Sequence, residues 1–115
     1  MPRQQLLFKD IRIVIEPFGK DNGNKPFVSI DLDVLNRVML DLTASEFKLW
    51  MYLSGNKNGY EFHYSVTVAE SFTGLSRSTL YDQWKHLVAK GYIVENSDET
   101  FLFYQLPQRL KNQDL

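Results

Sequence analysis

The stretch from Ser65 to Gly91 is SVTVAESFTGLSRSTLYDQWKHLVAKG, and it contains two helical patterns separated by a tight turn. Thr67 and Glu70 have the spacing of a capping box, in which each side chain bonds a free backbone amide at the start of a helix. Gly74 then interrupts the pattern, as glycine commonly does just past a helix end. The first pattern therefore predicts a short helix that ends at Thr73.

The second pattern predicts a longer helix between Ser76 and Gly91. Ser76 is a favoured N-cap residue, because its hydroxyl accepts a hydrogen bond from a backbone amide of the first turn. Apolar side chains recur at helical spacing and form one inward stripe: Leu80, Trp84, Leu87 and Val88. A helix, a turn and a second helix thus follow one another directly.

The flanking sequence adds further elements. Thr43 and Glu46 have capping-box spacing and predict a helix over residues 43–54, and residues 34–39 are also spaced like a helix. Runs that favour strands at residues 92–94 and 101–104 are separated by polar residues and predict a hairpin. Extended segments are predicted at residues 11–16, 27–32 and 60–62. The tail from Pro107 fits either one frayed turn of helix or an unstructured end.

Length and composition limit the possible classes. The 115 residues suit one domain with a modest core, and 43% hydrophobic residues are enough for the chain to fold unaided. There is no cysteine, which excludes disulfides, a thiolate nucleophile and cysteine zinc sites. No apolar run approaches the roughly 20 residues of a membrane span, and no secretory signal is visible. We therefore expect a cytoplasmic protein with no membrane partner.

The residues of the turn carry a resemblance to a known family. Thr73–Tyr81, TGLSRSTLY, closely resembles the turn and recognition helix of winged helix-turn-helix DNA-binding domains of bacterial regulators, and the likeness continues through Lys90 and Gly91. Residues 27–32 (FVSIDL) and 42–49 (LTASEFKL) resemble the lead-in to winged-helix domains of plasmid and phage replication proteins. The resemblance covers roughly residues 27–104.

This resemblance implies an α+β fold in which a three-helix core carries a β-hairpin wing. We expect an N-terminal arm, strand and polar loop over residues 1–26, the winged-helix domain over residues 27–106 and a tail over residues 107–115. The implied function is sequence-specific binding of double-stranded DNA. Such a protein would act in transcription regulation or in replication initiation of a plasmid or phage.

The helical period places one set of side chains of the second helix toward DNA. At about 100° per residue, Ser78, Asp82 and Lys85 point outward, opposite the inward stripe. Arg77 is the first candidate for a base contact, and Asp82 could accept from cytosine N4. The complete candidate DNA-binding set is Ser76, Arg77, Ser78, Thr79, Tyr81, Asp82 and Lys85. In the alternative interpretation the serines only cap the helix and the rest is a solvated face.

Several residues depart from what DNA binding favours. The family often has alanine four residues before the turn glycine, where this chain has Glu70 and the alanine is displaced to Ala69. Asp82 stands where the family is often basic, and the hairpin tip is acidic, with Glu95, Asp98 and Glu99. The formal net charge is −1, although phosphate binding depends on clustered Lys and Arg.

These departures keep a second class of function open, a winged-helix scaffold that binds a protein partner as an inhibitor or assembly factor. His63 and His86 have no ligand spacing, so we predict no metal, no cofactor and no enzyme activity. One short reading helix rarely gives high specificity alone. We therefore expect a homodimer or a larger protein partner.

Overall fold

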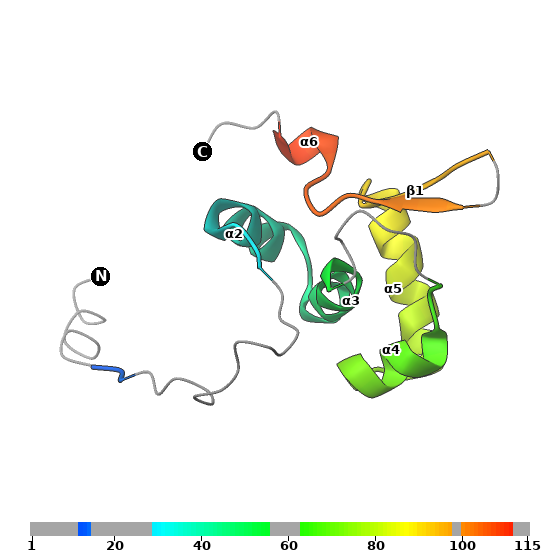
Figure 1. Ribbon diagram of the computed structural model, residues 1–115, viewed down its shortest axis with the longest axis horizontal. Helices are drawn as coiled ribbons and strands as arrows, with labels where there is room; N and C mark the ends of the chain where they lie inside the picture. Colours follow the sequence, from blue (N-terminus) through cyan, green and yellow to red (C-terminus); the bar gives the residue numbers. More distant parts are fainter. Residues whose placement is uncertain (1–11, 15–28, 56–62, 98–99, 112–115) are drawn as a thin grey trace.

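The computed structural model describes residues 12–14, 29–55, 63–97 and 100–111. Within these ranges the chain has an α+β architecture, with five helices and one antiparallel hairpin (Figure 1). In chain order the elements are α2 (Leu32–Asp41), α3 (Ala44–Ser54), α4 (Val66–Thr73), α5 (Arg77–Ala89), β1 (Ile93–Glu95), β2 (Phe101–Phe103) and α6 (Gln108–Lys111). None of the helices among these residues is long and apolar enough to cross a membrane.

Two helix starts predicted from the sequence are confirmed. At α3 the Thr43 amide donates to Glu46 Oε1 at 2.9 Å, and the Glu46 amide donates to Thr43 Oγ1 at 3.3 Å, which completes the capping box. At α5 the Ser76 side chain accepts from the Thr79 amide. Short-range signals fix these ends because both partners of each bond lie within one helical turn.

The predicted capping box at Thr67 is wrong. Helix α4 begins at Val66, and its N-cap is Ser65, whose Oγ accepts from the Val68 amide at 3.2 Å. The earlier start includes Val66 in the helix, where it packs against the core. Ala69 lies on the inner face and has no exposed surface. Helix α4 ends as predicted at Thr73, and its C-cap Gly74 has φ +76°, the left-handed conformation that suits glycine.

The core lies around α3, which contacts both α4 and α5. Its side chains come from α2, α3, α4, α5, β1, α6 and the residues that border them: Val38, Leu42, Leu49, Trp50, Tyr52, Leu53, Ala69, Leu80, Leu87, Tyr92, Ile93 and Leu110. Trp50 is fully buried, and its Nε1 donates to the Gln105 carbonyl at 3.0 Å. That bond ties α3 to the segment after the hairpin.

The inward stripe of α5 is correct at Leu80 and Leu87, both fully buried, but Trp84 is only half-buried. The Trp84 ring lies at the edge of the core, 4.7 Å from the Tyr64 ring and in an edge-on contact with Phe101 at 5.4 Å. Val88 is exposed. The core therefore covers a narrower arc of α5 than the apolar stripe.

The hairpin is confirmed, with Ile93 opposite Phe103 and Val94 opposite Leu102. The N-terminal strand is not found at residues 12–14, where Ile13 is 80% and Val14 is 92% exposed. An alternating pattern becomes a strand only where another strand pairs with its backbone. The remainder of that predicted strand and the one at 60–62 lie outside the described residues. Residues 29–31 precede α2 without strand structure.

Of the two alternatives for the tail, the turn of helix is the one found. Leu110 of α6 is 5% exposed and belongs to the core. Arg109 Nε donates to the Lys90 carbonyl at 2.8 Å, so the turn is anchored at the end of α5. Residues 112–115 lie outside the described part.

Candidate functional site

All seven residues predicted to form the site lie at the N-terminal cap or in α5, and their placement on one helix follows the prediction. Six are exposed, and Thr79 is half-buried. Ser76 Oγ donates to Thr79 Oγ1 at 2.9 Å and lies 3.3 Å from Ser78 Oγ. The three hydroxyls thus form one small cluster that closes the start of α5.

Arg77 is held against α4. Its Nη2 donates to Thr67 Oγ1 at 3.0 Å and lies 3.5 Å from Glu70 Oε1, while about half of its side chain remains exposed. Both contacts with α4 involve Nη2, and a guanidinium carries five N–H groups in all. Arg77 can therefore approach a base or phosphate from its exposed side, but Glu70 compensates part of its charge.

Glu70 is the residue that departs from the family pattern, and the structure gives it a clear partner. The small buried residue of α4 is Ala69, one position earlier. Glu70 therefore lies at the margin of α4, half-buried, where it compensates the charge of Arg77. The sequence predicted the displacement of the alanine but not the ion pair, which depends on how α4 faces α5.

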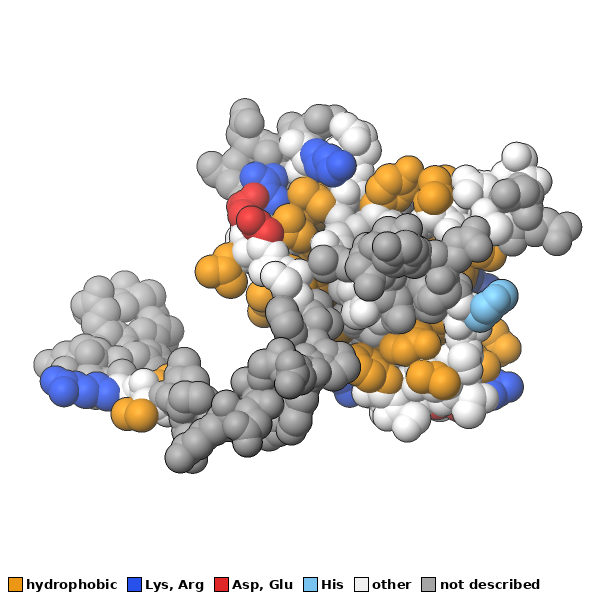
Figure 2. Space-filling model, viewed as in Figure 1, with side chains coloured by type: hydrophobic (Ala, Val, Ile, Leu, Met, Phe, Trp, Pro, Cys, Tyr) orange, Lys and Arg blue, Asp and Glu red, His pale blue; other side chains and the backbone are white. Residues whose placement is uncertain are grey.

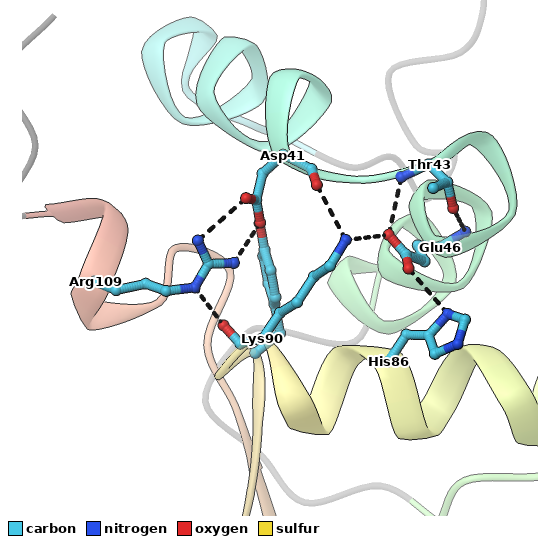
Figure 3. Close-up of polar contacts among 7 residues, drawn as sticks. Asp41, Thr43, Glu46, His86, Lys90 and Arg109 are labelled. Atoms are coloured by element: carbon cyan, nitrogen blue, oxygen red, sulfur yellow. Dashed lines mark hydrogen bonds and ion pairs between the residues drawn. The ribbon is translucent and has the colours of Figure 1, made fainter.

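The C-terminal half of α5 faces a different cluster (Figure 3). Glu46 is 3% exposed, and its Oε1 accepts from Lys90 Nζ at 2.7 Å. Its Oε2 lies 3.0 Å from His86 Nδ1. Glu46 thus caps α3 and also binds the last turn of α5, so a single carboxylate joins the two helices.

A second carboxylate continues this network. Asp41, at the end of α2, accepts from the Tyr92 hydroxyl at 2.8 Å and forms a two-bond ion pair with Arg109. Lys90 Nζ also donates to the Asp41 carbonyl at 3.1 Å. The network therefore connects α2, α3, α5 and α6, and it fixes the C-terminal end of α5.

The network shifts the pKa values of its acids and of its tyrosine. Burial alone would raise the pKa of Glu46, but hydrogen bonds from Lys90 and the Thr43 amide outweigh it and lower that pKa from 4.5. The pKa of Asp41 is lowered from 3.8 in the same way, with burial opposed by the bonds from Arg109 and Tyr92. Burial and the Asp41 carboxylate raise the pKa of Tyr92. Both acids are therefore charged at neutral pH.

Sequence reasoning missed this network. The capping box located Glu46, and the end of α5 located Lys90, but 44 positions separate the two residues and no local pattern connects them. An acid at the third position of a helix and a lysine at the end of another are each explained locally. Among the described residues, no group of three His, Cys, Asp or Glu side chains is arranged to hold a metal ion.

Comparison with known proteins found no relative of this chain. No family model matches it, and neither a curated protein nor a solved structure is significantly similar to it.

Proposed function

We propose that this chain is a winged-helix protein that binds double-stranded DNA in a sequence-specific manner through α5. The observation that carries the proposal is the exposed N-terminal half of α5, which follows a left-handed turn at Gly74 and carries Arg77 and three hydroxyls. In a helix-turn-helix the second helix enters the major groove by this end. The order of α3, α4, α5 and hairpin is compatible with a winged helix.

The side chains divide into two roles under this proposal. Arg77 contacts a base, and Asp82 accepts from a neighbouring cytosine N4. Lys85 binds a phosphate one turn further along, while Ser76, Ser78 and Thr79 position the backbone and Tyr81 borders the contact. Binding would act by occupancy, either in transcription regulation or in replication initiation of a plasmid or phage.

Fluorescence anisotropy with random and selected duplexes tests this function. Arg77→Ala should cost about 1 to 3 kcal/mol on selected sites and relax preference at one position, whereas Lys85→Ala should weaken all duplexes alike. Lys48→Ala, at an exposed lysine of α3, is the matched control and should change nothing. The absence of binding above background at low salt, in folded protein, would contradict the proposal.

A second candidate is a scaffold that binds a basic protein surface through the hairpin. The observation in its favour is charge: residues 91–106 hold three acids and no Lys or Arg, and Glu95 is exposed on β1. Acidic side chains repel the phosphate backbone of DNA, but they attract and orient a basic protein partner. Folded protein that fails to bind any duplex would favour this candidate.

A further inference from the structure

The Arg77 guanidinium is held by a helix other than its own. Arg77 is the first residue of α5, and the first turn of that helix contains no acid. The positive end of the helix dipole disfavours a cation at this position, so α5 alone does not hold the guanidinium. Its contacts come from α4, through Thr67 Oγ1 at 3.0 Å and Glu70 Oε1 at 3.5 Å, both with Nη2. Helix α4 therefore determines how Arg77 is oriented.

The turn between the two helices keeps this relation constant. Thr73 Oγ1 donates to the Ala69 carbonyl at 2.6 Å and accepts from the Leu75 amide at 3.1 Å. These bonds close the end of α4 onto the first residues that follow it. The position of Thr67 relative to Arg77 is thus fixed by a short, hydrogen-bonded connection.

The two acceptors of α4 act on the guanidinium in different ways. The Thr67 hydroxyl is uncharged and accepts a hydrogen bond of ordinary length, which restricts the rotamers of a long side chain. Glu70 lies further away and acts mainly through its charge. Thr67 therefore orients Arg77, whereas Glu70 reduces its attraction to phosphate.

Placement of a base-reading group matters in a chain with little positive charge to spare. The formal net charge is −1. Figure 2 shows Lys and Arg side chains of the described residues in several separate places on the visible face. Phosphate contacts give affinity without sequence information, whereas base contacts specify the site. Base preference should therefore depend strongly on how the guanidinium of α5 is oriented.

We propose that Thr67 is a positioning residue for DNA reading, whose hydroxyl holds Arg77 in the orientation in which its guanidinium meets a guanine. This inference rests on the proposed function of α5. The contact of arginine with guanine is directional, and a side chain that is already oriented loses less freedom on binding. Base preference at one position is then set by a residue of α4 that contacts no base.

Fluorescence anisotropy of the full chain tests this role, with a selected duplex and with duplexes in which each base pair of that site is replaced in turn. Thr67→Val keeps the branched side chain but removes the hydroxyl. It should lower base preference by about two- to fivefold, the size of one exposed hydrogen bond, at the position that Arg77→Ala relaxes. Affinity for random duplexes should stay unchanged. Thr67→Ser keeps the hydroxyl and should restore the preference.

Two comparisons separate positioning from other roles. In an Arg77→Ala background, Thr67→Val should have no effect on any duplex, because the side chain that it positions is gone. Glu70→Gln should strengthen selected and random duplexes alike and leave the preference unchanged. Circular dichroism establishes that each variant is folded, and Thr67→Ala serves in place of Thr67→Val should the valine unfold α4.

The outcomes distinguish this inference from the proposed function. Folded wild type that binds no duplex above background would overturn both. Wild type that binds its selected duplex, with a preference that Thr67→Val leaves unchanged, would overturn only the role of Thr67. A loss that is equal on all duplexes, or that persists without the Arg77 side chain, would assign Thr67 to a phosphate contact and would also overturn the proposal.

Discussion

Replacement of Lys90 by methionine tests the network that fixes α5. Methionine keeps most of the apolar stem but removes the charge that bonds Glu46 Oε1 at 2.7 Å and the Asp41 carbonyl at 3.1 Å. The carboxylate of Glu46 stays buried, with only the Thr43 amide and His86 as partners. A buried charge that loses its partner becomes a net cost to the folded state.

The expected loss follows from these contacts. Leaving a buried ion without any partner costs about 3 to 5 kcal/mol, and one hydrogen bond to a charged group is worth about 1.5 to 3 kcal/mol. Glu46 keeps two of its partners, and the Lys90 side chain is 32% exposed, so solvent already screens part of the interaction. We therefore expect Lys90→Met to lower the free energy of unfolding by about 2 kcal/mol.

Urea unfolding at pH 7, followed by tryptophan fluorescence and circular dichroism, measures this loss. Glu46→Gln removes the charge that Lys90 neutralises, so the double variant should be less destabilised than the two single effects predict. A coupling of at least about 1 kcal/mol is expected for side chains in direct contact. Additive effects would refute the reasoning, as would a loss below about 0.5 kcal/mol for Lys90→Met.

The same experiment at lower pH gives an independent check. The pKa of Glu46 is lowered in the folded protein, so its contribution to stability is present above about pH 4.5 and is lost as the pH falls through the folded-state value. The difference between wild type and Lys90→Met should therefore shrink below pH 4.5. A difference that stays constant or grows in acid would show that the lysine does not act through this carboxylate.

Two further predictions concern the core and the proposed DNA-binding face of α5. Trp50→Ala should lower the free energy of unfolding by about 3 to 5 kcal/mol, because Trp50 is fully buried. Trp84→Ala should lower it by about 2 kcal/mol, because Trp84 is only half-buried. Equal losses in urea unfolding would contradict this ranking. If α5 binds DNA, Glu70→Gln should free Arg77 and strengthen duplex binding by about two- to fivefold in anisotropy, an effect absent in an Arg77→Ala background. Asp33→Asn is the matched control, because it removes an exposed acid from α2 that pairs with Arg37 and not with Arg77, so duplex binding should not change.

The sequence predicts those parts of the fold whose signals are local. The capping box at Thr43, the N-cap at Ser76 and the turn at Gly74 each need only residues within one or two turns of a helix. The hairpin follows from two short apolar runs. In contrast, the start of α4 lies at Ser65, where Val66 packs against the core, and not at the capping-box spacing of Thr67. The strand expected around Ile13 needs a pairing partner that no local pattern specifies.

The candidate site likewise has features that the sequence predicts and features that depend on packing between helices. Exposure of Arg77 and Lys85 follows from the helical period and from the position of Leu80 and Leu87. The contact of Arg77 with α4 and the burial of Glu46 follow from how separate helices meet, which periodicity does not encode. Local spacing therefore indicates which side chains of α5 face solvent. It does not indicate which of them already contact another helix.

The two ends of α5 have different roles in the folded protein, and this limits how the helix can bind. His86 and Lys90, near its C-terminal end, are committed to Glu46, so only Arg77 and Lys85 remain as positive groups for a ligand. Arg77 is itself compensated by Glu70. Lys85 and the partly compensated Arg77 can neutralise few phosphates. Affinity for DNA rises with the number of phosphates that a protein neutralises. A single copy should therefore bind weakly, and an interface that pairs two copies of α5 would double the contacts without any change to the helix itself.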